Sequence, residues 1–289
     1  MDFKEKFVGF IDVLGFKKLV EAAEAGNGMA LTDLLDLLKK FGSPEEREKF
    51  GKYGPTVCPQ SAHLQRDLDF RLTQISDCAI VSTEVSPAGV INLVNHCWGI
   101  VIGFLQSGVM CRGYITRGPI FHTDTQVIGT GYQKAYEKEG KVAAFKREAD
   151  ERGTPFVEVD RAVCDYVTNC QDRCVKEMFS RYVGDDGELV ALFPFKRLAH
   201  SFVVAGFGQK FDPEKERRSN QNVRVMLENF KRRVMGFVDT SNPSAVRKAE
   251  HYIRALDAQL VVCDRTDEMI ALLNSPFPSR RQWSEDHEA

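Results

Sequence analysis

The sequence has no long apolar run, no secretion signal and no excess charge of either sign. No uninterrupted apolar stretch reaches the roughly 20 residues that span a bilayer. The longest candidate, residues 90–109, is interrupted by polar side chains that include Asn92 and His96. Residues 1–6 are too charged for a signal peptide. The formal net charge of -2 favours neither a nucleic-acid nor a membrane partner. We therefore expect a cytoplasmic protein that binds neither.

Cysteine is present, but in no arrangement that holds a metal or a disulfide framework. The chain has eight cysteines, and no two form a Cys-x-x-Cys pair. Cys170 and Cys174 are four apart without matching histidine or cysteine partners, so we expect no zinc site. The six histidines show no ligand spacing, and we assign none of them a role. Without a secretion signal, we expect free thiols in a reducing compartment.

Internal repeats and low-complexity tracts are also absent from the 289 residues. Composition is ordinary for a globular protein, with 43% hydrophobic and 28% charged residues. We expect a first domain over 1–150 and an α/β extension over 151–275 that is continuous with it or packs on it. Residues 42–60, rich in glycine, proline and charge, are predicted to form a loop, and 276–289 a disordered tail.

The most informative stretch is residues 7–18, in which an apolar, β-prone run ends at Gly15 and a helix follows. Such a run predicts a strand buried on both faces. Asp12 lies inside it, where an ionised carboxylate costs several kcal/mol unless a cation compensates it. A helix N-terminus just beyond offers backbone N–H groups to an anion. Together these features indicate metal and phosphate. The alternative is an aspartate that caps a strand–helix corner.

A second carboxylate stands at a hairpin tip. Residues 68–75 and 79–83 are predicted strands joined tightly at Ser76-Asp77. Two aspartates on neighbouring strands, beside a helix N-terminus, are what two-metal phosphoryl transfer requires. Carboxylate oxygens are the hard ligands that Mg²⁺ and Mn²⁺ prefer.

The rest of the chain alternates helices and strands. We predict a helix over 31–38, a buried helix over 87–106, a strand over 112–121 with arginines near both ends, a glycine turn over 128–132 and a polar helix over 133–148. Beyond these, we predict strands over 155–159 and 189–195 and helices over 161–179, 220–235 and 244–263.

In this order of elements the chain resembles the class III nucleotidyl cyclases. Residues 10–16 resemble their first metal motif, in which the aspartate and the next backbone carbonyl bind metal and the following turn binds triphosphate. Ser76-Asp77 resembles the second metal aspartate, and Arg112 matches the triphosphate-binding arginine. The resemblance covers about residues 5–140. It implies a ferredoxin-like α+β sandwich with a C-terminal helical or mixed extension.

The resemblance also assigns site residues and partners. It implies two Mn²⁺ or Mg²⁺ ions per site and a homodimer with composite active sites. The metal ligands would be Asp12, the backbone carbonyl of Val13, and Asp77, and the catalytic residues Asp12, Asp77 and Arg112. The expected nucleotide contacts are Phe10, Val13, Leu14, Gly15, Phe16, Thr73, Arg117 and Tyr132.

The base-reading positions depart from the common patterns. Adenylate cyclases use a lysine four residues before the second metal aspartate and an aspartate before the glycine turn. Here these positions are Thr73 and Gln126, and the glutamate and cysteine of guanylate cyclases are absent as well. In the helix, Gln133 and Glu137 replace the usual asparagine and arginine.

Residues 129–139 and 115–118 resemble instead the bacterial pyrimidine cyclases of the Pycsar anti-phage systems. That resemblance implies a lyase that makes cyclic UMP or cyclic CMP, whose product acts on a separate cyclic-nucleotide-gated effector. We expect UTP as the substrate. A cytidylate cyclase, a purine cyclase and a degenerate dimerisation module without activity stay open as alternatives. A diguanylate cyclase is disfavoured because its Gly-Gly-acidic-acidic-Phe hairpin is missing.

Several assigned side chains have simpler interpretations. Arg112 and Arg117 could be strand-end arginines paired with surface acids. Tyr132 and Tyr136 lie four apart on one helical face, so they could pack in the core or at a dimer contact rather than read the base.

Overall fold

The computed structural model describes residues 2–42, 68–195 and 211–274. Almost all of the predicted loop 42–60 and the whole predicted tail 276–289 lie outside these ranges. The cysteines within them are free thiols, as expected.

Four antiparallel strands form the centre of the sheet, in the order β2-β3-β1-β4. Their bounds are Lys4–Val13 (β1), Arg71–Ile75 (β2), Cys78–Glu84 (β3) and Cys111–His122 (β4). Helices connect β1 to β2 and β3 to β4, which makes two interleaved βαβ units of the ferredoxin-like kind. The predicted α+β fold is therefore confirmed.

The sheet continues past β4 into the second half of the chain. β6 (Val157–Val159) runs parallel to β4, and β8 (Val190–Leu192) and β7 (Val183–Asp185) follow antiparallel. A short β5 (Val127–Ile128) pairs with the end of β4. The division at residue 150 remains a prediction.

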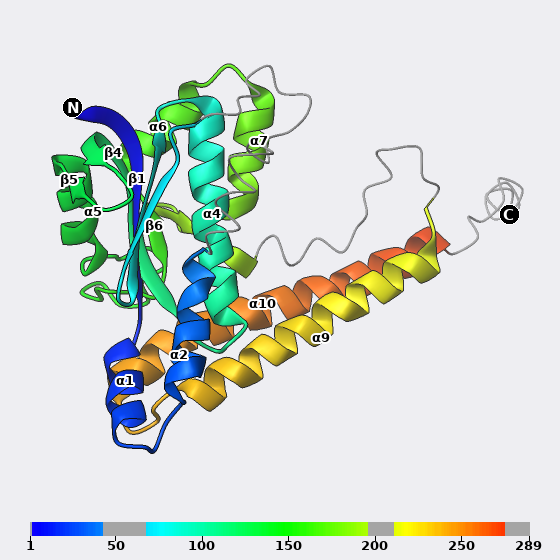
Figure 1. The fold of residues 1–289 in the computed structure, drawn as a ribbon. Helices are drawn as coiled ribbons and strands as arrows, with labels where there is room; N and C mark the ends of the chain where they lie inside the picture. The colour runs from blue at the N-terminus through cyan, green and yellow to red at the C-terminus, as the bar shows by residue number, and fades with distance from the viewer. Residues whose placement is uncertain (1, 43–67, 196–210, 275–289) are drawn as a thin grey trace, which may run out of the picture.

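The two faces of the sheet carry different helices (Figure 1). α4 (Pro87–Leu105) and α7 (Arg173–Tyr182) lie on one side, and α5 (Thr130–Glu139) lies on the other. Because successive strand residues point to opposite faces, Phe7 and Ile11 enter the core with α4, while Phe10 packs with Ala135 of α5. Among the described residues, the other helices before the C-terminal pair are α1 (Phe16–Glu24), α2 (Leu31–Leu38), the 3₁₀ turn Lys39–Phe41 and α6 (Arg161–Asn169).

α4 is the central apolar helix of the core. Ser86 caps it by accepting a hydrogen bond from the Gly89 N–H, and Pro87 occupies its first turn. By length and composition α4 could cross a membrane, but 72% of the relevant window is buried inside the protein. The sequence prediction of a buried helix here is confirmed.

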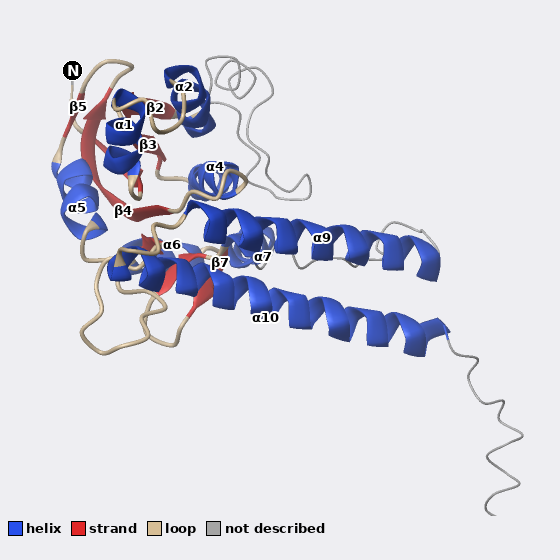
Figure 2. Ribbon diagram, turned by 90° about the horizontal axis from the view of Figure 1, so that it is seen from below, coloured by secondary structure: helices blue, strands red, loops and turns tan. Residues whose placement is uncertain are grey.

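The C-terminal part is a long helical hairpin of α9 (Pro213–Phe237) and α10 (Pro243–Asn274), which extends away from the sheet (Figures 1 and 2). Its turn meets α1, where the Lys18 ammonium lies 2.6 Å from the Asp239 carboxylate. Near the sheet, Leu227, Phe230 and Tyr252 of the two helices share one buried cluster. The hairpin thus brings the start of α10 to the end of β1.

Four helix predictions differ from the structure. The helix predicted over 133–148 ends at Glu139, and Gly140 follows it. The helix predicted over 161–179 is two helices, because Asp172 caps a new one by accepting from the Cys174 N–H. The last two helices are longer than predicted, since their periodicity is masked by charged residues along their exposed faces.

Candidate active site

Both predicted metal aspartates lie at the same end of the sheet. Asp12 stands opposite Cys78 on β3 and opposite Arg112 on β4. Directly opposed residues of antiparallel strands point to the same face, so Arg112 shares the α5 face with Asp12. Asp77 directly precedes β3, and its backbone oxygen accepts a hydrogen bond from the Val13 N–H at 3.0 Å. The fold therefore brings Asp12, Asp77 and Arg112 together.

Negative charge accumulates at this position. The pKa of Asp12 is raised from 3.8 to about 7, first by burial, then by the negative charge of Glu139 and of Asp77. Arg112 and Lys248 act in the opposite direction. A carboxyl whose ionised form is disfavoured by burial and by like charges is stabilised by a bound cation. Asp12 is such a carboxyl.

Arg112 has a partner that sequence reasoning missed. Its Nε donates to Oε1 of Glu139, the last residue of α5, and both side chains are mostly buried. A signal for Glu139 existed in the sequence, because Tyr132, Tyr136 and Glu139 recur at helical spacing on one face. The buried face of α5 carries Gly131, Ala135 and Glu139. Phe10 contacts both tyrosine rings at the edge of that face, where Tyr136 is exposed.

The turn after β1 has the form expected of an anion-binding turn. Gly15 has φ +80, a left-handed conformation that glycine adopts without strain, and it precedes the first residue of α1. No side chain caps this helix start. The first N–H groups of a helix lack partners within the helix and suit an anion, although at α1 the Lys18 N–H already donates to the Gly15 oxygen at 3.1 Å.

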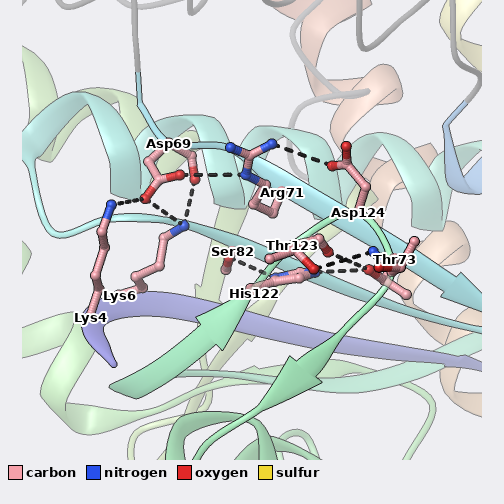
Figure 3. A network of polar contacts seen from close by, with 10 residues as sticks. Lys4, Lys6, Asp69, Arg71, Thr73, Ser82, His122, Thr123 and Asp124 are labelled. Atoms are coloured by element: carbon pink, nitrogen blue, oxygen red, sulfur yellow. Dashed lines mark hydrogen bonds and ion pairs between the residues drawn. The ribbon is translucent and has the colours of Figure 1, made fainter. Parts of the chain in front are cut away.

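Two predicted contacts have partners outside the group of Asp12, Asp77 and Arg112. Thr73 shares the α5 face, but its Oγ1 lies 3.0 Å from Nε2 of His122 and donates to the Thr123 backbone oxygen at 3.4 Å (Figure 3). Arg117 stands opposite Phe7. Five residues separate it from Arg112, so it points to the other face about 16 Å along the strand. Its Nε donates to Glu5 Oε1 at 3.0 Å.

The other predicted nucleotide contacts belong to the core or to its edge. Phe10 and Phe16 have exposed fractions of only 4% and 6%, so their side chains support the site from within the core. Val13 is buried, and Leu14 donates its N–H to the Met110 oxygen at 2.9 Å. Tyr132 is half-buried against Phe10.

The carboxylates suit a magnesium or manganese ion. Within the described ranges no three His, Cys, Asp or Glu side chains gather as a closed metal cage. Mg²⁺ is usually held by one or two carboxylates together with water and substrate phosphates, not by a cage made of protein alone. Asp12, Asp77 and the backbone carbonyl of Val13 are a donor set of that open kind.

No protein-family model matches the chain, and no curated protein does. Among solved structures, the chain is similar to the catalytic core of a rhodopsin-guanylyl cyclase with converted specificity, in complex with ATPαS. The identity is 12% and the TM-score 0.37, over 58% of this chain and 83% of that one.

Proposed function

We propose that the chain is a nucleotidyl cyclase, a phosphorus–oxygen lyase that converts UTP to 3′,5′-cyclic UMP and pyrophosphate. The observation that carries the proposal is the meeting of Asp12 and Asp77 at one end of the sheet. Beside them lie the Gly15 turn and, across from Asp12, the guanidinium-bearing Arg112. Two carboxylates and two anion-binding groups suit a metal-bound triphosphate.

The proposed reaction is an in-line displacement. The ribose 3′-oxygen forms a bond to the α-phosphorus, the bond to the bridging oxygen of the β-phosphate breaks, and pyrophosphate leaves. The hydroxyl proton passes to solvent. When bound, the Mg²⁺ or Mn²⁺ ions supply positive charge that offsets the charge of the triphosphate.

The protein's own part is positioning and electrostatic stabilisation. Asp12, Asp77 and the Val13 carbonyl would hold the ions, and the start of α1 would bind phosphate. In the described part of the chain, Arg112 uses Nε toward Glu139. A guanidinium has five N–H donors, so its Nη groups remain for phosphate oxygens. Glu139 thereby orients the Arg112 guanidinium and leaves its Nη groups to bind phosphate.

The base and the biological role are the finer parts of the proposal. Thr73 and Gln126 replace the charged purine readers, which supports a pyrimidine, and the likeness of residues 129–139 to Pycsar cyclases supports an anti-phage signal. In that role the protein acts in the cytoplasm, without nucleic acid or membrane, and its product activates a separate cyclic-nucleotide-gated effector. A homodimer with two composite sites fits two-fold symmetry.

A purified sample incubated with equal concentrations of UTP, CTP, ATP and GTP tests the proposal directly, with Mn²⁺ and Mg²⁺ in parallel and products separated by chromatography. We expect cyclic UMP to predominate. Predominant cyclic CMP would change the base, and predominant cyclic AMP or cyclic GMP would reject the pyrimidine assignment. No cyclic product with any nucleotide and either metal would leave the dimerisation module as the better interpretation.

A further inference from the structure

The first turns of α10 border two pockets beside the candidate active site. One pocket, of about 240 Å³, lies between the α9–α10 turn and the end of β1, and Gly15, Met110 and Lys248 are among its lining residues. The other, of about 270 Å³, is lined mainly by charged residues such as Arg152 and Arg247. Lys248 belongs to both linings. It therefore stands where the C-terminal hairpin meets the carboxylates.

Lys248 is electrically part of the site. Its side chain is half-buried, and its pKa is lowered, first by burial and then by the positive charge of Arg112. Glu139 and Asp12 act on it in the opposite direction. The same proximity makes Lys248 one of the two cations that lower the pKa of Asp12.

Lys248 differs from the neighbouring cations in having no close partner. Arg112 forms an ion pair with Glu139, and Lys18 forms one with Asp239. Among the residues that the structure describes, Lys248 has neither a hydrogen bond nor an ion pair within 4.0 Å. A half-buried ammonium without a partner is unfavourable, whereas an anion held between Lys248 and Arg112 would give it one. Lysine is well suited to phosphate as a compact point charge.

We propose that Lys248 binds the pyrophosphate portion of the nucleoside triphosphate, so that the C-terminal hairpin completes the active site. The inference rests on the proposed function, since it names a substrate contact of that site. Negative charge grows on the leaving pyrophosphate as its bond to the α-phosphorus breaks. A cation already in place stabilises that charge without reorganisation. Lys248 is then a substrate-binding residue from a segment outside the region that resembles known cyclases.

The competing interpretation is that Lys248 only offsets the charge of Asp12 and Glu139. In that case its loss would change stability and leave phosphate affinity intact. The variant Lys248→Met keeps the aliphatic stem and removes the charge, and Lys248→Arg restores a charge. Arg247→Met is the matched control, because Arg247 is exposed, is next to Lys248 on α10, and lines the charged pocket of about 270 Å³ but not the one beside Gly15.

Inorganic triphosphate binding, measured by calorimetry with the full chain in the presence of Mg²⁺, separates the two interpretations. We expect Lys248→Met to weaken binding at least about tenfold, as loss of a charged contact does, while Lys248→Arg recovers most of it and Arg247→Met changes it less than threefold. If Lys248→Met is poorly folded by circular dichroism, Lys248→Gln takes its place. Triphosphate affinity equal to that of the unmodified protein, in a folded Lys248→Met or Lys248→Gln, would overturn the proposal, as would no binding by the unmodified protein.

Turnover supplies a second readout. We expect Lys248→Met to lower kcat by about 100-fold, within the range found for loss of one transition-state contact. If the unmodified protein makes no cyclic nucleotide, the proposed function fails, but the triphosphate comparison still decides whether Lys248 binds phosphate. If cyclisation is intact and Lys248→Met keeps both kcat and triphosphate affinity, only the inference about Lys248 fails.

Discussion

Two polar clusters lie on the α5 side of the sheet and differ in how far their charged side chains are paired. One of them, which we call the edge network, is shown in Figure 3, and each of its charged side chains has an ion-pair partner within it. The site cluster carries an excess of negative charge; its members are Asp12, Asp77, Arg112, Glu139 and Lys248. Within the described ranges its one ion pair is Arg112 with Glu139. The edge network comprises Lys4, Lys6, Asp69, Arg71, Thr73, Ser82, His122, Thr123 and Asp124.

The edge network satisfies its charges internally. Asp69 Oδ2 lies 3.0 Å from the Lys4 ammonium and 3.2 Å from that of Lys6, and its Oδ1 lies 3.5 Å from Arg71 Nε. The ring nitrogens of His122 lie 3.0 Å from Thr73 Oγ1 and 2.8 Å from Ser82 Oγ. Complete pairing is typical of groups that stabilise a fold. A cluster whose charged groups are mostly unpaired, beside a pocket, is typical of a binding site.

The largest expected effect is on turnover when the site cluster loses an aspartate. We expect Asp12→Asn or Asp77→Asn to lower cyclisation at least about 1000-fold, because each removes one of the proposed metal ligands. The melting temperature at pH 8 should stay level or rise for Asp12→Asn, since the change removes a charge that burial, Glu139 and Asp77 disfavour. Product formation with Mn²⁺ and thermal melting measure the two effects. Turnover within tenfold of the unmodified protein would contradict the metal assignment.

Asp69→Ala in the edge network should do the opposite and lower stability. The Lys6 side chain is only 3% exposed, so loss of the Asp69 carboxylate leaves a buried ammonium whose remaining partner is the backbone oxygen of residue 69, at 2.6 Å. Breaking a buried pair costs about 3 kcal/mol. The control Asp124→Ala removes a mostly exposed partner of Arg71 and should cost below about 0.5 kcal/mol. Urea unfolding of the two variants measures the loss in free energy of unfolding. Equal losses for Asp69→Ala and Asp124→Ala would contradict the expected difference between a buried and an exposed pair.

The histidine of the edge network predicts a pH dependence of stability. Burial, followed by the positive charges of Lys6 and Arg71, lowers the pKa of His122 from 6.5 to about 4. The negative charges of Asp124 and Asp69 act on this pKa in the opposite direction. Since the folded state then holds fewer protons, its stability is fully present above pH 6.5 and falls as the pH drops toward 4. The loss from this group is about 3 kcal/mol. Urea unfolding from pH 7 to pH 4 should show it, and His122→Asn should remove that part of the slope; an unchanged slope would contradict the assignment.

The sequence located the parts of the site that depend on local pattern. Asp12 interrupts an apolar strand, Gly15 ends it and Asp77 sits at a tight hairpin, so each is visible within a few residues. The strand order follows from the sequence of elements. Pairing β1 with β4 then sets Arg112 opposite Asp12, a consequence of register rather than of local composition.

The parts that sequence reasoning missed depend on tertiary packing. Helical spacing indicated Glu139, but it did not indicate the pairing of Glu139 with Arg112, because that pairing depends on how α5 crosses the sheet. His122 received no role because its two partners come from other strands. Lys248 has no local signal, since it reaches the site through the turn of a hairpin more than 200 residues after Asp12.

The smallest expected effect comes from Arg117, which sharpens the comparison because it shares a strand with Arg112. Strand periodicity sets the two side chains on opposite faces, and Arg117 pairs with Glu5 where both side chains are more than a third exposed. Such pairs contribute little to stability. Because its guanidinium lies on the face opposite the site cluster, Arg117→Ala should change turnover less than about threefold. Arg112→Ala should lower turnover at least about 50-fold, as expected for loss of a charge-stabilising donor.

Initial rates at saturating nucleotide, with the oligomeric state of each variant followed by sedimentation, compare the two arginines. If Arg117→Ala lowered turnover more than about 30-fold in an intact dimer, its guanidinium would have to act on a nucleotide bound outside the site cluster of its own subunit. The separation of the two arginines along β4 leaves the partner subunit as the place for that nucleotide. The same result would therefore support composite sites and the sequence prediction that Arg117 contacts nucleotide.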